Sequence, residues 1–269
     1  MKAFHYLFPI VALTASAVQA QEADCVTATA AASTTSYKAG ESFYIAMQAE
    51  VAQPWHAYFR NPATIGEPLA AELKAPAGFT VKGPYYSAPE RHESPIGVAY
   101  IYQHATIVWQ VTPEASAPAN ATFTATTTAQ CCSDEGCNPP ETDKVEVKLA
   151  AGDGAADPAW KGQEKQVEKL GEEKLDYKCS QSGNSVTIKL PTLTAAKEVY
   201  FFSDDNCINP TAKQAFSGGE LKLQRNDNKD VMYPVKNESQ VGKPLKKLRG
   251  MLVADGKVYT IKASFKAVK

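Results

Sequence analysis

The chain has no excess of either charge and, beyond its first twenty residues, no long hydrophobic run. It carries 28 Lys and Arg against 29 Asp and Glu, and the basic residues are scattered along the sequence. Proteins that bind nucleic acid need a basic surface, so we expect no nucleic acid among the partners. No later stretch approaches the ~18 apolar residues of a membrane helix, so we expect no direct membrane span there.

Residues 1–20 have the features of a secretory signal peptide. Lys2 lies near the start, an apolar run covers residues 7–13, and small residues lead to an expected cleavage after Ala20. Cys25 is not preceded by the small apolar box of a lipoprotein anchor. The sequence therefore predicts an exported chain in an oxidising compartment, where cysteines form disulfides.

Short strand patterns punctuated by Pro and Gly fill the remaining sequence. In residues 42–51 apolar side chains alternate with polar ones, which is typical of a half-buried strand. Similar patterns predict an all-β fold of two sandwich domains. We expect a first domain at 25–150, a linker at 151–175 that contains a short helix laid on the surface, and a second β domain at 176–269. Within the second domain, Asp255-Gly256 predicts a hairpin turn.

Three of the six cysteines fall within seven positions, and this cluster is the candidate redox site. A bridge between the adjacent Cys131 and Cys132 would be strained. We favour a pair of Cys131 and Cys137, because five intervening residues let two strand ends approach within disulfide range. Cys132 is the alternative partner of Cys137, or it pairs with Cys25 or stays free. The alternative to a redox role is that the same pair is a structural disulfide that links the two sides of a hairpin.

The second predicted domain has two cysteines of its own, Cys179 and Cys207. No other cysteine is near them in the sequence, so we expect a structural disulfide between them.

The histidines give little support to a metal site. Together with the cysteines, His56, His92 and His104 have the ligand types for a soft metal ion, but no Cys-x2-Cys or His-x3-His spacing is present. We therefore expect solvated or core-packed histidines, no metal and no cofactor. Four aromatic residues are interpreted as core residues: Trp55, Tyr58, Phe59 and Trp109.

The stretch Cys131-x5-Cys137-Asn-Pro-Pro-Glu-Thr resembles the active-site loop of the N-terminal periplasmic domain of the thiol:disulfide interchange protein DsbD. Upstream motifs resemble the related "disulfide bond corrector" domain of DsbD-like and ScsB-like proteins: Trp55-His56-x-Tyr58-x-x-Asn61-Pro62, Gly66-x-Pro68, Pro76-x-Gly78-Phe79 and Ala88-Pro89-Glu90-Arg91. From about residue 176 onward the chain is more loosely similar to the second β domain of the ScsB-like branch.

This resemblance implies an immunoglobulin-like, periplasmic domain whose two cysteines carry electrons. It implies that Cys137 meets the partner and that a cap loop covers the cysteines, with His92, Glu93 and Pro95 as the matching residues. The chain departs from the family in this loop, which lacks the shielding aromatic residue. It also lacks the membrane bundle and the thioredoxin-like domain into which full-length members continue.

The leading hypothesis is an exported thiol–disulfide interchange protein, similar to a protein-disulfide reductase. It would relay reducing equivalents between a membrane electron-transfer partner and periplasmic thioredoxin-like or disulfide isomerase proteins. The acidic residues Asp134, Glu135 and Glu141 predict raised thiol pKa values, so that the partner's thiolate is the attacker. One alternative is a non-catalytic periplasmic module that binds a protein or copper and has structural disulfides. A cell-envelope structural protein is a third hypothesis.

Overall fold

The described part of the chain is built almost entirely of β-strands. The computed structural model describes residues 25–95, 97–168, 175–227 and 243–265. Within these ranges the helical elements are two three-residue 3-10 turns, η1 (Gln163–Lys165) and η2 (Pro191–Leu193). The predicted all-β fold is confirmed. The expected signal peptide lies outside the described residues, and among those described no helix is long and apolar enough to cross a membrane.

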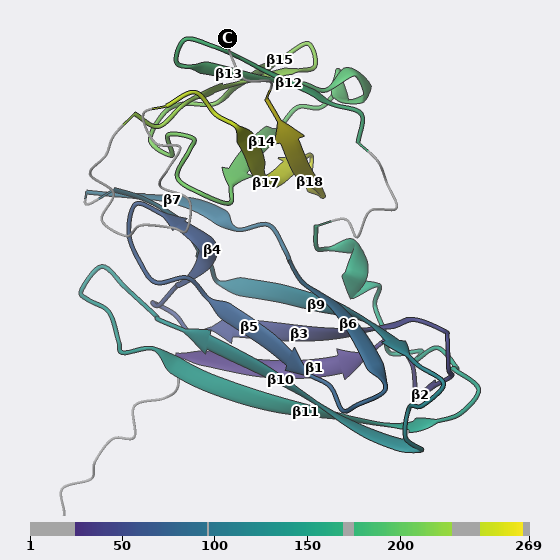
Figure 1. The fold of residues 1–269 in the computed structure, drawn as a ribbon. Helices are drawn as coiled ribbons and strands as arrows, with labels where there is room; N and C mark the ends of the chain where they lie inside the picture. The colour runs from purple at the N-terminus through teal and green to yellow at the C-terminus, as the bar shows by residue number, and fades with distance from the viewer. Residues whose placement is uncertain (1–24, 96, 169–174, 228–242, 266–269) are drawn as a thin grey trace, which may run out of the picture.

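Two four-stranded sheets form the first half of the molecule and pack face to face (Figure 1). One has the order β1 (Val26–Ala32), β3 (Phe43–Val51), β9 (His104–Pro113) and β6 (Phe79–Tyr86). The other has the order β2 (Ser36–Tyr37), β11 (Glu141–Ala151), β10 (Asn120–Ala129) and β5 (Ala70–Lys74).

The core between these sheets follows the alternation of the strands. The apolar residues predicted for one face of β3 are buried, and Ile45 and Met47 are fully buried. In β10 the odd-numbered positions from Ala121 to Ala129 are buried, with Phe123 fully buried. Successive side chains of a strand point to opposite faces, so β10 turns its odd-numbered residues toward the core.

A third sheet extends the first half toward the second. Its order is β4 (Ala57–Ala63), β8 (Gly97–Tyr102) and β7 (Glu90–Ser94), all antiparallel. β7 and β8 form the hairpin that contains the predicted cap loop, and residue 96 lies outside the described residues.

The second half contains two smaller sheets, in the upper part of Figure 1. One has the order β12 (Lys178–Ser182), β13 (Ser185–Lys189), β16 (Glu220–Gln224) and β15 (Ala215–Ser217); the other has the order β14 (Val199–Ser203), β17 (Lys247–Ala254) and β18 (Lys257–Ser264). The predicted hairpin joins β17 to β18. Asp255 and Gly256 have φ of 45° and 77°, as a turn with two left-handed residues requires.

The two halves contact each other through polar and aromatic residues. Arg60 of β4 donates to Glu168, which is 5% exposed, and to Asp204 after β14. Burial by itself would lower the pKa of Arg60, but the two carboxylates outweigh it and raise the pKa. Phe202 of β14 packs edge-on against Tyr100 of β8, with ring centroids 4.9 Å apart. The division into two domains stays a prediction.

The described part of the segment before the second half has less helix than the sequence predicts for the whole segment. In its described part, the expected short surface helix is reduced to η1. Val167 and Glu168 after this turn are buried, because Val167 packs against Ala46 and Val108 while Glu168 pairs with Arg60. Residues 169–174 lie outside the described residues.

Candidate redox site

The cysteine loop is a tight hairpin at the end of β10. The Ser133 N–H donates to the Gly136 carbonyl at 2.8 Å, and the Asn138 N–H donates to the Cys131 carbonyl at 2.9 Å. Between these two bonds, Cys132 and Cys137 lie opposite each other in an antiparallel bridge. Residues 133–136 therefore form the turn, and the two cysteines form its base.

Cys132 and Cys137 are joined by a disulfide with an S–S distance of 1.98 Å. Cys132 is 2% exposed, whereas Cys137 is exposed to solvent. The favoured prediction of a Cys131–Cys137 pair is therefore wrong, and the alternative pair with Cys132 is the one present. The disulfide therefore joins an exposed residue to a buried one, and access favours attack at Cys137.

Cys131 forms a second disulfide, with Cys25 at the start of β1. Both residues are buried, with exposed fractions of 0% and 1%. Cys131 continues the inward-facing odd positions of β10, so its side chain points to the core and toward β1, while Cys132 points to the other face. This alternation is the physical reason for the correction, and it is a signal that the sequence already contains.

The start of β1 is also held by the carboxylate side chains of β11. The Cys25 N–H donates to Glu141 Oε2 at 3.0 Å, and the Ala28 N–H donates to Asp143 Oδ2 at 2.8 Å. Glu141, predicted to act on the redox thiols, thus stabilises the edge of β1. Asp134 and Glu135 are in the exposed turn of the cysteine loop.

His56 lies directly opposite Cys132, on the side away from Cys137. The His56 N–H donates to the Cys132 carbonyl at 2.9 Å, and the Cys132 N–H donates to the His56 carbonyl at 3.0 Å. Residues that exchange both backbone bonds have side chains on the same face of a sheet. The side chains of His56, Cys132 and Cys137 therefore form one row.

Two further side chains surround this histidine. The Tyr58 hydroxyl lies 3.3 Å from His56 Nε2, and Tyr58 also packs with Cys132 in a small buried cluster. The ring of His92, on β7, is centred 5.6 Å from that of His56. Burial lowers the pKa of His56 and the neighbouring His92 lowers it further, whereas Asp134 raises it. From the sequence, His56 is a candidate soft-metal ligand or a solvated or core-packed residue, and Tyr58 is a core residue. Neither of them is predicted to lie beside the disulfide.

The other predicted cap residues lie on the same hairpin as His92. Glu93 is exposed and forms an ion pair with Arg91, and Pro95 is exposed in the turn. His104 is exposed and pairs with Glu50, so it does not join the other histidines. Among the residues described, no group of three or more His, Cys, Asp and Glu side chains is placed to hold a metal ion.

The predicted disulfide of the second half is not formed. Cys179 on β12 and Cys207 after β14 are free thiols. The Cys207 Sγ lies 3.5 Å from the Ser203 hydroxyl, within a buried polar group that includes Asp205. Burial raises the pKa of Cys179 to about 11, and burial together with Asp205 raises that of Cys207 well above its usual value. Both thiols are therefore poor nucleophiles near neutral pH.

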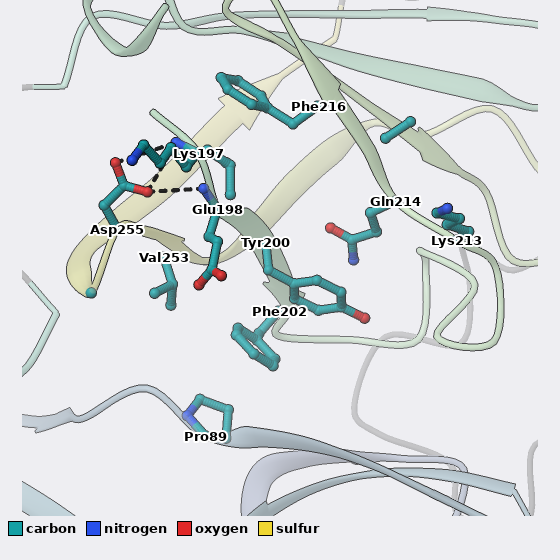
Figure 2. A pocket seen from close by; sticks show the side chains of 13 residues that line it. Pro89, Lys197, Glu198, Tyr200, Phe202, Lys213, Gln214, Phe216, Val253 and Asp255 are labelled. Atoms are coloured by element: carbon teal, nitrogen blue, oxygen red, sulfur yellow. Dashed lines mark hydrogen bonds between the residues drawn. The ribbon is translucent and has the colours of Figure 1, made fainter. Parts of the chain in front are cut away.

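A cavity of ≈ 670 Å³ lies beside the edge strand β14 (Figure 2). Tyr200, Phe202 and Pro89 line it, and none of its lining residues is a cysteine or a histidine. Gln214 donates to the Phe201 carbonyl at 2.8 Å and accepts from the Phe201 N–H at 2.9 Å. The Gln214 side chain thus forms hydrogen bonds with two backbone groups at the edge of β14, as a neighbouring strand would.

A structure of the N-terminal periplasmic domain of ScsB from Proteus mirabilis has a similar fold. The TM-score is 0.58 at 13% sequence identity, and the match covers 92% of this chain and 96% of that chain. A reduced DsbD N-terminal domain from Neisseria meningitidis matches with a TM-score of 0.28 at 17% identity, over 40% of this chain and 78% of that chain. The comparison with curated proteins gave no significant match.

The sequence comparison with protein families covers the first half of the chain, including both disulfides described above. Residues 22–149 match the family described as "Thiol:disulfide interchange protein DsbD, N-terminal". This part of the chain therefore belongs to the family of DsbD N-terminal domains.

Proposed function

We propose that the protein is an exported thiol–disulfide interchange protein that works through Cys132 and Cys137. The observation that carries the proposal is the asymmetry of this pair: Cys137 is exposed, and Cys132 is buried at the base of the same loop. The adjacent Cys131 is occupied in a buried bridge with Cys25, so it does not compete for Cys137.

Reduction of the pair takes two exchange steps. The thiolate of a reduced partner attacks Cys137 Sγ, which forms a mixed disulfide and breaks the Cys132–Cys137 bond; Cys132 leaves as a thiolate and takes up a proton. The second thiol of the partner then loses its proton, attacks the mixed disulfide and releases Cys137. The partner ends as a disulfide and this chain as a dithiol, so two electrons have moved.

The reverse sequence passes these electrons to an oxidised acceptor. We place this exchange in the periplasm, between a membrane electron-transfer partner and thioredoxin-like or disulfide isomerase proteins. The family and the expected signal peptide support this location. Asp134 and Glu135 beside the exposed sulfur disfavour a Cys137 thiolate, which supports a mechanism in which the partner provides the attacking thiolate during reduction.

Trapping of mixed disulfides tests the proposal. A Cys132→Ala variant keeps the exposed Cys137 and loses the thiol that resolves the intermediate, so it should accumulate partner adducts at Cys137. Cys137→Ala should accumulate few, because Cys132 is shielded. Adducts that form only at Cys132 would contradict the proposal. So would a reduction potential of the Cys132–Cys137 bond below about −300 mV, which is typical of structural bridges.

A non-catalytic binding module is the second candidate, and the cavity beside β14 is the observation that favours it. Its rim has Lys197 and Lys213 as well as Glu198 and Asp255, so its charges favour neither anions nor cations. A variant with Tyr200→Ala would distinguish the two candidates. Exchange at Cys137 should be unchanged in this variant if the redox proposal is right.

A further inference from the structure

The row formed by His56, Cys132 and Cys137 has a consequence for the second step of exchange. When this chain in its dithiol state reduces an acceptor, Cys137 first forms the mixed disulfide. Cys132 must then lose its proton to attack Cys137. An ordinary cysteine has a pKa of about 8.5, and burial in an apolar site raises it further, so an unaided Cys132 has little thiolate near neutral pH. Its neighbours Tyr58, Ala99 and Ile101 provide such a site.

We propose that His56 is the base that accepts the proton of Cys132 in this resolving step. The inference rests on the proposed function and adds to it the residue that makes the buried sulfur reactive. His56 and Cys132 are directly opposed and exchange both backbone hydrogen bonds. In such a pair the Cβ atoms are about 5 Å apart on one face, which brings an imidazole nitrogen within reach of the thiol.

The surroundings of His56 suit a base rather than a permanent cation. Partial burial and the neighbouring His92 both favour the neutral imidazole. When Nε2–H donates to the Tyr58 hydroxyl, Nδ1 has the free lone pair that takes the proton. Asp134 favours the imidazolium once it forms, because the two opposite charges attract.

The resolving step moves one proton and exchanges one sulfur–sulfur bond for another. The proton of Cys132 moves to His56 Nδ1, the Cys132 sulfur attacks Cys137 Sγ, and the bond between Cys137 and the acceptor sulfur breaks. The acceptor leaves as a thiolate and the imidazolium returns its proton to this thiolate or to water. The chain is oxidised from a dithiol to the Cys132–Cys137 disulfide, and the acceptor is reduced by two electrons.

The experiment follows both steps with one probe. The chain with Cys132 and Cys137 reduced and with Cys179→Ala, which removes the half-buried background thiol, is mixed with dithiobis(nitrobenzoate). Attack by Cys137 releases a first coloured thiolate, and attack by Cys132 on the mixed disulfide releases a second. The rate of the second release measures the resolving step by itself, as a function of pH.

We expect the second release in the parent chain to rise with pH through the titration of His56, below pH 6.5, and then to level off. In His56→Asn this rise should be absent, and the rate near pH 7 should fall at least tenfold, as general-base catalysis of about 10²–10⁴-fold predicts. The rate should recover above pH 9, where the thiol ionises unaided. The first release should change less than about twofold, since Cys137 does not depend on the base.

Two further variants test whether the effect is specific to His56. His104→Asn removes an exposed histidine that pairs with Glu50, and it should leave both phases unchanged. His92→Asn keeps His56 but removes the neighbour that lowers its pKa, so the rise of the second phase should move to higher pH. An unchanged second phase in His56→Asn, or an equal loss in both phases, would overturn the inference. If the parent chain itself never gave a second release, the proposed function would fail instead.

Discussion

The two disulfides of the first half should differ sharply in what they contribute to stability. Cys25 and Cys131 are separated by 106 residues, whereas Cys132 and Cys137 are separated by 5. A bridge limits the unfolded chain more when it closes a longer loop. From the entropy of loop closure, the Cys25–Cys131 bridge should contribute about 4.7 kcal/mol to the free energy of unfolding and the Cys132–Cys137 bridge about 2 kcal/mol. The first value is a large share of the ~5–15 kcal/mol by which a typical domain is stable.

The perturbation is the removal of each bridge by a double substitution to Ala. The free energy of unfolding, measured by denaturant titration, should fall by several kcal/mol in Cys25→Ala with Cys131→Ala. It should fall by about 2 kcal/mol or less in Cys132→Ala with Cys137→Ala. A short bridge that proved as stabilising as the long one would refute the reasoning, because the entropy of loop closure would not then be what distinguishes them.

A graded reductant gives the complementary measurement on the native chain. Cys137 is exposed and Cys25 and Cys131 are buried, so alkylation and mass spectrometry should find Cys132 and Cys137 reduced first. Simultaneous labelling of all four cysteines under native conditions would show that the buried bridge is not protected. The division of roles between a protected bridge and a reducible one would then be wrong.

Three more outcomes follow from contacts of individual residues. Gly66→Ala should destabilise the fold by about 1–3 kcal/mol, measured as a lower unfolding midpoint, because Gly66 has φ +98° and an added Cβ would meet the Tyr58 ring at 2.4 Å. Arg60→Met should cost ~3 kcal/mol of unfolding free energy by leaving Glu168 buried without a cation, and the paired replacement of Glu168 by Gln should recover part of it. Alkylation of Cys179 in the native protein should be slow at pH 7, and its rate should rise with pH because burial raises the pKa of this thiol to about 11. A rate that no longer rises above pH 8 would contradict this.

The strands were predictable because their patterns are local. The alternation in β3 and the positive-φ pair Asp255-Gly256 each act within a few residues, and the structure contains the strand and the hairpin they predict. The short helix of the linker was less predictable. The described part of the linker has contacts from far along the chain, which a local pattern does not contain: Gln163 is hydrogen-bonded to Gln48, and Glu168 pairs with Arg60.

The disulfide pairing failed because the prediction chose between Cys131 and Cys132 by spacing and did not extend the inward-facing positions of the preceding strand to Cys131. Spacing allows Cys137 to pair with Cys131 or with Cys132. The odd-numbered residues of β10 face the core, and Cys131 continues this series and is buried in the core. For Cys179 and Cys207 the prediction used proximity in sequence alone. Packing instead leaves Cys207 beside the Ser203 hydroxyl, with both thiols free.

Adjacent cysteines at a strand end can serve two purposes because they face opposite sides. Cys131 attaches the end of β10 to β1 through a bridge that is out of reach of solvent, and Cys132 is the next residue on the other face. When an exchange reaction opens Cys132–Cys137, the loop loses its own covalent link. Its base remains fixed by the Cys25–Cys131 bond and by the two backbone bonds between His56 and Cys132. We therefore expect Cys132 to keep its place opposite His56 in the reduced state, so that the site need not reorder before the disulfide forms again.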